Sequence, residues 1–240
     1  MPQYMTPGVY VEEISTLPPS VAEVATAVPA FVGYTEIGPA DTDAPVVARI
    51  ASLLEFKTRF GRAQRLKFNV AADASPPAVA AVAPAANFAL HHAVNHYFKN
   101  GGGPCWIASI GTYSSTPGKQ RYLDGLAAIE KEDEPTLLVL TDAACTLAAA
   151  PYYEVCAEAL AQCRRQGDRF TILDVHGGKW DDFRNDPSLA INLMYGAAYH
   201  PYLQTTIACE YDDGDVALQK AGAPTGDTLA SIRSTQTALY

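Results

Sequence analysis

The hydrophobic positions of this chain alternate between short apolar runs and longer stretches in which apolar residues recur at helical spacing. Ala30 to Tyr34 (AFVGY) and Thr136 to Leu140 (TLLVL) are apolar runs of the kind that forms strands covered on both faces of a sheet. Asn87 to Asn100 has helical spacing and is followed by a run of glycines, which indicates the end of a helix. We therefore predict an α/β domain with a mostly parallel sheet flanked by helices.

The same rules place the other elements of the body, which we expect to extend over residues 21–210. Further helices are predicted at Ser52 to Phe60, Tyr122 to Ile129, Tyr152 to Arg165 and Ser188 to Tyr199, and further strands at Cys105 to Ile110, Arg169 to Val175 and Leu203 to Ala208. Residues 62–84 are rich in proline and alanine and are predicted to be a loop or an insertion. Residues 211–240 are expected to form a polar tail and the start of a helix near Asp227, incomplete at Tyr240.

The first 20 residues differ from this body. Val9 to Ile14 is strand-like with apolar side chains on both faces, and it lies between the turn signal Thr6-Pro7-Gly8 and the pair Pro18-Pro19. One short strand of this kind is marginal alone. We therefore predict that residues 1–20 form an extended N-terminal arm that pairs with the sheet edge of a neighbouring subunit. The pairing residues are Thr6, Pro7, Gly8, Val9, Tyr10, Val11, Glu12, Glu13 and Ile14.

Composition narrows the class of partner. The chain has 240 residues, of which 48% are hydrophobic and 18% charged, so a sizeable core is expected. The formal net charge of −9 disfavours binding to nucleic acid or to an anionic membrane surface. The first residues lack the pattern of a signal peptide, and no apolar run is long enough to span a membrane. We expect a protein that is made in the cytoplasm and binds neither nucleic acid nor membrane.

The motifs that would mark a nucleotide or catalytic site are missing. Neither G-x-G-x-x-G nor G-x-x-x-x-G-K-[ST] occurs, and Gly101-Gly102-Gly103 precedes a predicted strand rather than a helix. His176-Gly177-Gly178 follows a predicted strand, where α/β folds place functional loops, but no nucleophile motif accompanies it. An ordinary turn is the favoured interpretation. Asp174 precedes that turn, and a capping role is favoured over catalysis.

Two sets of residues suggest metal binding only weakly. His92 and His96 are four residues apart on a predicted helix, a spacing that can hold zinc, but no third ligand is near in sequence. A polar helix face or an interface pair is favoured. Asp212-Asp213-Gly214-Asp215 matches half of a calcium loop, and a solvated loop is favoured. We therefore predict no catalytic residue, no bound cofactor and no metal site.

A series of segments, in order along the chain, resembles tail sheath proteins of contractile phage tails and of phage-tail-like extracellular contractile injection systems. The series begins with the arm and continues through the first core strand, a short helix that ends in Phe-Gly, and a helix, glycine turn and strand. The segments are Tyr4 to Ile14, Thr26 to Gly33, Pro39, Pro45 to Ile50, Phe56, Phe60-Gly61, Ala93 to Gly102, Cys105, Tyr199 to Tyr202 and Tyr211 to Asp213.

This resemblance implies a function. Sheath subunits stack in helical layers around an inner tube, and N- and C-terminal arms add strands to neighbouring subunits. The expected partners are further copies of the chain, an inner tube protein, and baseplate and cap proteins, in a phage tail or injection-system particle. Pro18 and Pro19 are the expected hinge of the arm. Family members are usually longer, so the C-terminal part that faces the tube is expected to be missing here.

Two alternatives remain open. One is a sheath-related cap or baseplate component that does not polymerise. The other is an α/β ligand-binding enzyme, which only the fold class favours, and fold class does not imply function. An enzyme would be stabilised by its ligand and would not depend on the arm.

Overall fold

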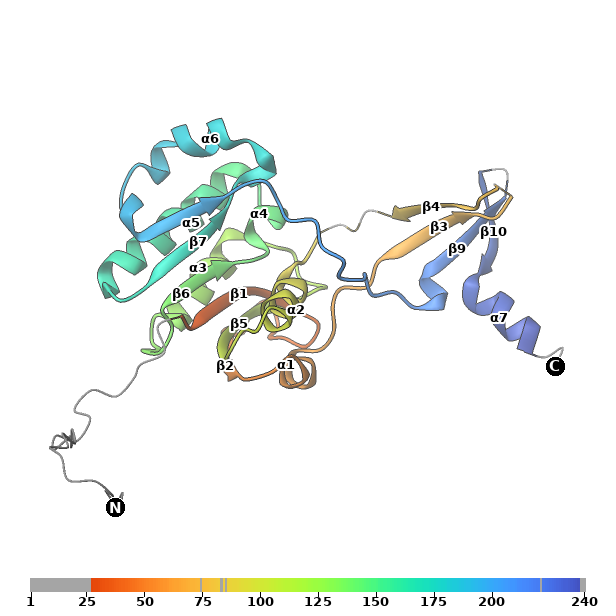
Figure 1. The fold of residues 1–240 in the computed structure, drawn as a ribbon, viewed down its shortest axis with the longest axis horizontal. Coiled ribbons are helices and arrows are strands. Elements are labelled where there is room, and N and C mark those ends of the chain that lie inside the picture. Colours follow the sequence, from red (N-terminus) through yellow and green to blue (C-terminus); the bar gives the residue numbers. More distant parts are fainter. Residues whose placement is uncertain (1–26, 74, 83, 85, 221, 238–240) are drawn as a thin grey trace, which may run out of the picture.

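The computed structural model describes residues 27–73, 75–82, 84, 86–220 and 222–237, which form a larger and a smaller lobe (Figure 1). The larger lobe holds a six-stranded sheet of order β2-β5-β1-β6-β7-β8. Its strands are β1 (Pro29–Thr35), β2 (Val46–Ile50), β5 (Cys105–Thr112), β6 (Leu137–Leu140), β7 (Phe170–Asp174) and β8 (Gly196–Tyr199). Its helices are α1 (Leu53–Phe60), α2 (Leu90–Lys99), α3 (Lys119–Ile129), α4 (Ala143–Thr146), α5 (Ala149–Gln166) and α6 (Trp180–Asn185).

Neighbouring strands of the larger sheet run parallel, except that β2 runs antiparallel to β5. The predicted α/β architecture, with a mostly parallel sheet flanked by helices, is confirmed. The predicted strands at 30–34, 105–110, 136–140 and 169–175 and the predicted helices at 52–60, 87–100, 122–129 and 152–165 all correspond to observed elements. The sequence analysis did not predict β2.

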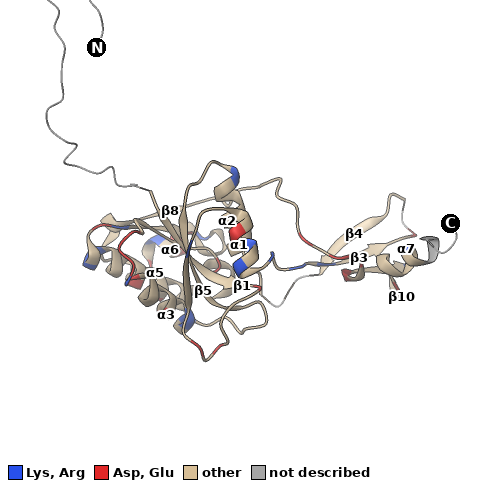
Figure 2. Cartoon of the chain, turned by 90° about the horizontal axis from the view of Figure 1, so that it is seen from below, with Lys and Arg blue, Asp and Glu red and all other residues tan. Residues whose placement is uncertain are grey.

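Helices cover both faces of the middle of this sheet. Figure 2 shows the sheet close to edge-on, with α3 and α5 on one side and α1 and α2 on the other. All seven residues of β1 are buried because this central strand is covered on both faces. Side chains alternate between the two faces of a strand, so Ala30 and Val32 join the core under α3 and α5, whereas Phe31 joins the core under α1 and α2.

Helix α1 illustrates how local sequence sets the boundaries of an element. The Ser52 side chain accepts a hydrogen bond from the Glu55 amide and caps the first turn. Phe56 and Phe60, four residues apart, are both buried. Gly61 ends the helix with a φ of 85°, which glycine adopts readily because it has no Cβ.

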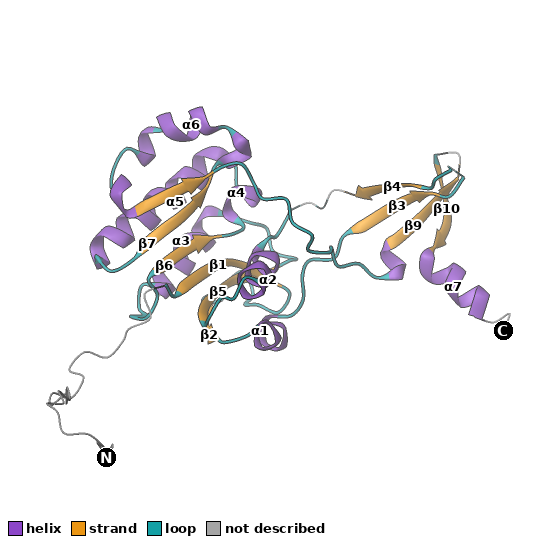
Figure 3. Cartoon of the chain, viewed as in Figure 1, coloured by secondary structure: helices purple, strands orange, loops and turns teal. Residues whose placement is uncertain are grey.

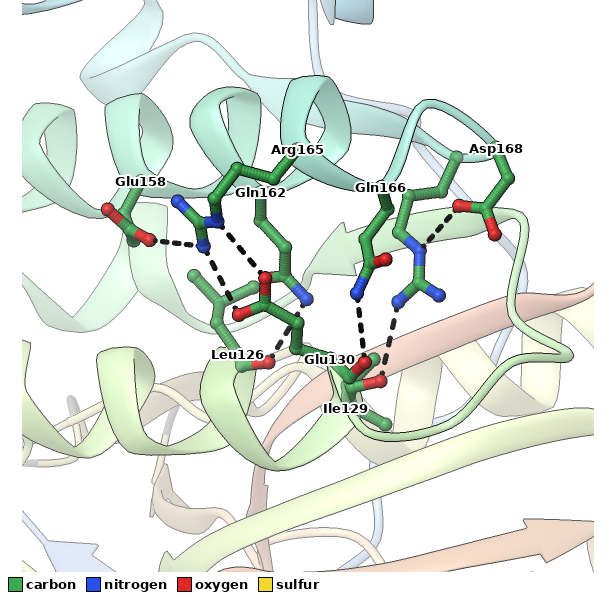
Figure 4. Close-up of polar contacts among 9 residues, drawn as sticks. Leu126, Ile129, Glu130, Glu158, Gln162, Arg165, Gln166 and Asp168 are labelled. Carbon is green, nitrogen blue, oxygen red and sulfur yellow. Dashed lines mark hydrogen bonds and ion pairs between the residues drawn. The ribbon is translucent and has the colours of Figure 1, made fainter.

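Polar contacts join the C-terminal end of α3 to α5 and the residues that follow α5 (Figure 4). The Arg165 guanidinium binds both carboxylate oxygens of Glu130 and also Glu158. The Gln162 side chain donates to the carbonyl of Leu126, a buried hydrogen bond. Arg169, whose side chain is almost fully buried, donates to backbone carbonyls at and beyond the C-terminus of α3: those of Ile129 and Glu132. These donors add side-chain hydrogen bonds to backbone carbonyls at the C-terminal end of α3.

The smaller lobe consists of a four-stranded sheet and a helix, and loops connect it to the larger lobe (Figure 3). Its sheet has the order β10-β9-β3-β4, in which β3 runs antiparallel to β4 and parallel to β9. The elements are β3 (Lys67–Ala71), β4 (Ala78–Val82), β9 (Val216–Lys220), β10 (Ala223–Thr228) and α7 (Leu229–Thr237). Two segments far apart in the sequence therefore form one sheet.

The smaller lobe corrects two predictions. Residues 62–84 are not a loop, because they contain β3 and β4; the alternative prediction of an insertion stays a prediction. Residues 211–240 are not simply a polar tail with the start of a helix, because β9 and β10 precede α7. Strand β4 lacks a period-two apolar pattern, and all five of its residues are exposed.

Two further predictions are wrong near the edge of the larger sheet. The predicted helix at 188–199 is replaced by two short 3₁₀ turns and the strand β8. Asn192 has a φ of 65°, which interrupts a right-handed helix. The predicted strand at 203–208 is an exposed segment without a strand partner among the described residues. Its residues are mostly exposed.

A buried carboxylate joins three elements of the larger lobe. Asp142 is fully buried directly after β6. Its Oδ2 accepts a hydrogen bond from the amide of Tyr34 in β1 (2.6 Å), and its Oδ1 accepts from the amides of Ala89 (2.5 Å) and Leu90 (2.7 Å) at the start of α2. The carboxylate therefore caps α2 and ties it to the centre of the sheet.

We predict that Asp142→Ala lowers the free energy of unfolding by at least about 3 kcal/mol, because it leaves three buried backbone donors without an acceptor. Asp142→Asn should cost less, roughly 1–2 kcal/mol, because the amide oxygen can still accept from the start of α2. Chemical denaturation measures both values. A loss below about 1 kcal/mol for Asp142→Ala would contradict the assigned role.

The stability should also depend on pH through this group. Burial raises the pKa of Asp142 to about 7 from 3.8, although the backbone donors to its carboxylate oppose the shift. Between these values the folded chain retains a proton that the unfolded chain releases. The free energy of unfolding of wild type, relative to that of Asp142→Asn, should therefore fall as pH rises from 5 to 7, by up to about 1.4 kcal/mol per pH unit, and level off above 7. A rise over this range would show instead that the backbone donors dominate and that the carboxylate is ionised throughout.

Candidate interaction surfaces

A groove of about 750 Å³ lies on the face of the larger sheet that carries α2. One wall is α2, the floor is formed by side chains of β6, β7 and β8, and the extended segment 200–207 forms the opposite wall. The principal apolar groups are Ala93, Val139, Ile172, Tyr199, Tyr202 and Leu203. We call this surface the groove.

The groove exists because the sheet is covered unequally. In β6 and β7, residues alternate between buried and half-buried, and the buried ones belong to the core under α3 and α5. Val139 and Ile172 point to the other face, where α2 covers only the neighbouring part of the sheet. Parallel sheets are usually covered on both faces. Among the described residues, no helix covers this part of the sheet.

The structure brings together three polar residues that the sequence analysis had singled out separately. His92, His96 and Asp174 all line the groove. No described residue donates a hydrogen bond to the Asp174 carboxylate, and burial raises its pKa. Burial also lowers the pKa of His92, and the carboxylate of Glu210 opposes this shift. Within the described ranges, no group of three or more His, Cys, Asp or Glu side chains is arranged to hold a metal ion.

The other sequence candidates have local structural roles. His176 contacts the Leu147 carbonyl through Nε2 (2.9 Å) and packs against Tyr152 and Tyr153, and Gly177 and Gly178 have positive φ. This segment is the ordinary turn that was favoured.

The acidic run forms a 3₁₀ turn before β9. Within it, the backbone amide of Asp212 is bonded to the side chain of Asp215. Asp212 forms an ion pair with Arg65, and Asp213 with Arg233. The acidic side chains at 212–213 are therefore paired within the chain.

The predicted arm lies outside the described residues. Thr6, Pro7, Gly8, Val9, Tyr10, Val11, Glu12, Glu13 and Ile14, with the hinge residues Pro18 and Pro19, belong to residues 1–26. Their role in strand exchange stays a prediction.

A third histidine of α2, which the sequence analysis did not consider, faces away from the groove into the core. His91 is buried, and its ring meets that of Phe56 edge-on at 5.6 Å between centroids. Neither ring nitrogen has a hydrogen-bond partner among the described residues. Burial is the main cause that lowers its pKa to about 4. Its position next to Leu90, which with Val94 forms the buried apolar stripe of α2, was the signal in the sequence.

None of the helices in the described ranges combines the length and apolarity that crossing a bilayer requires.

Comparisons with known proteins identify similar solved structures. A scan against protein-family models found no match, and a search of curated proteins found none either. Among solved structures, the chain is similar to the helical sheath of the anti-feeding prophage, determined by cryo-electron microscopy in its contracted state. The two are 26% identical with a TM-score of 0.48, and the similarity covers 82% of this chain and 46% of the sheath chain. This chain spans less than half the length of that sheath protein.

We predict that His91→Leu raises the free energy of unfolding at pH 7 by about 1 kcal/mol, because it removes a buried polar ring that makes no hydrogen bond. The variant should also lose less stability in acid. The lowered pKa of His91 means that wild type loses stability as pH falls from 6.5 towards 4. Denaturation at several pH values measures both effects. His96→Leu, at a partly exposed position, should change neither, and a destabilised His91→Leu protein would contradict the assignment.

Proposed function

We propose that this chain is a structural, non-catalytic subunit of a contractile sheath. In this proposal, it polymerises around an inner tube, and the assembled sheath shortens to drive the tube into a target cell. The observation that carries the proposal is the ordered series of sheath-like sequence segments. These coincide with elements of one α/β body: Ala30 to Gly33 lies in β1, Phe60-Gly61 ends α1, and Asn100-Gly101 ends α2.

The mechanism requires subunits that move as rigid bodies while remaining linked. The body has the features of a rigid unit: helices on both faces of a central sheet, a buried carboxylate that ties α2 to the strands, and polar contacts between α3 and α5. Links that survive movement are expected from the arm, because strand addition is made by backbone hydrogen bonds and a hinge at Pro18 and Pro19 permits rotation.

In this proposal, the energy for shortening is stored in contacts between subunits. An extended sheath is then metastable, and contraction exchanges one set of contacts for another without hydrolysis of a nucleotide. The proposed partners are other copies of the chain, the inner tube protein, and the baseplate and cap proteins. The proposed location is a phage tail or injection-system particle.

Electron microscopy of particles from the native source, with this polypeptide located by labelling, tests the proposal. Striated tubes that carry the label along their outer layer, in long and short forms, are the expected result. Label confined to a tube end would favour the cap or baseplate alternative. Particles without the label, together with a small molecule that stabilises the chain, would favour an enzyme instead.

We predict that replacing Val9 and Val11 by proline abolishes incorporation into such tubes, because proline removes backbone donors that a strand ladder requires. The body should keep its circular dichroism spectrum and thermal midpoint. The matched control, with threonine at both positions, keeps the donors and the β-branched shape and should assemble. Normal assembly of the proline variant would show that the arm does not act by strand addition.

A further inference from the structure

An exposed apolar loop lies between α6 and β8. Ile191, Leu193 and Met194 are 64%, 63% and 78% exposed, respectively, and we call these three side chains the apolar prominence. The loop is held in place: Asn192 has a left-handed backbone conformation, and its Oδ1 accepts a hydrogen bond from Arg164 of α5 (3.2 Å). Clustered apolar side chains on a fixed loop mark an interaction site rather than random exposure.

The apolar prominence and the groove lie on opposite sides of the sheet. Leu193 lines a small cavity together with Leu160 of α5 and Phe183, so the apolar prominence is on the α5 side. The groove is bounded by α2. Figure 2 shows α5 and α2 on opposite sides of the sheet. One copy therefore cannot insert its own apolar prominence into its own groove.

The two surfaces also match in charge. Arg164, beside the apolar prominence, is exposed and forms no ion pair with the described residues. The groove contains Asp174, whose carboxylate likewise has no partner there. The chain carries a net charge of −9, so two copies repel each other unless a contact pairs opposite charges.

We propose that the apolar prominence of one copy docks in the groove of a second copy, with Arg164 directed towards Asp174. The contact uses different surfaces on the two copies. Because these surfaces lie on opposite sides of the sheet, two copies cannot make both contacts with each other at once. The contact repeats head to tail and generates a ring or a helix. This inference rests on the proposed sheath function. The contact joins two rigid bodies and does not involve the arm.

The test uses the full chain with proline at Val9 and Val11, so that the arm makes no contribution, and measures association by sedimentation velocity over a concentration series. This starting protein should form oligomers larger than dimers as concentration rises. Adding Met194→Asp, which alters the apolar prominence, or Leu203→Asp, at the exposed rim of the groove, should each weaken association by at least about tenfold. Leu54→Asp, a control on α1 at a residue 75% exposed and outside both surfaces, should not weaken it.

A mixture of the two defective variants gives the decisive result. The Met194→Asp protein keeps an intact groove, and the Leu203→Asp protein keeps an intact apolar prominence. Mixing them should produce a 1:1 complex and nothing larger, at concentrations where each variant alone is monomeric. A starting protein that remains monomeric, variants that associate normally, or a mixture without a complex would each overturn the inference.

These outcomes are separate from those of the proposed function. If sedimentation behaves as expected but the native particles lack labelled tubes, the contact stands and the sheath function fails. If labelled tubes form normally with Met194→Asp, the sheath function stands and the contact fails.

Discussion

The larger lobe depends on the carboxylate of Asp142. It accepts hydrogen bonds from one amide of β1 and two amides of α2, and it follows β6 directly in the chain. A helix N-terminus presents unpaired donors and a partial positive charge, which a buried carboxylate can satisfy. The same carboxylate explains the glycine at position 33, because a Cβ there would collide with Asp142 Oδ2. The position of α2 on the sheet follows from this set of bonds.

The position of α2 in turn creates the surface that is open to a partner. The helix packs over β1 and β5 through Leu90 and Val94, so no helix of the described ranges covers the sheet beyond β1 on that side. The opposite face is filled by α3 and α5, which are joined by buried and exposed polar contacts. A parallel sheet with one face filled and the other half filled has an apolar surface that is costly to leave in water. In the proposed sheath, contact with a neighbouring copy removes that cost.

Sequence patterns predicted the body well because its strands and helices are strongly periodic. Residues 30–34 and 136–140 are buried on both faces and read as strands, and the glycines at 61, 101 and 167 end helices with positive φ. The smaller lobe could not be predicted in this way. Its strand β4 is a run of alanine and valine in which every residue is exposed. Strand β3 pairs with β9, and most of the larger lobe lies between these two strands in the sequence. The groove was equally hidden, because His92 and Asp174 lie on segments whose proximity depends on strand order. The role of Asp142 was missed because its partners come from two other segments.

The two lobes differ in how far they can stand alone. The larger lobe buries two clusters of apolar side chains, whereas Val216 is the only buried residue within the described strands of the smaller sheet. A sheet with so little core gains stability from what lies against it. In the proposed sheath, the larger lobe therefore keeps its shape through every rearrangement, and the smaller lobe depends on its surroundings. This difference between the lobes suits an assembly that stores energy in contacts between subunits. Those contacts then lie outside the rigid larger lobe, and one set can replace another without unfolding it.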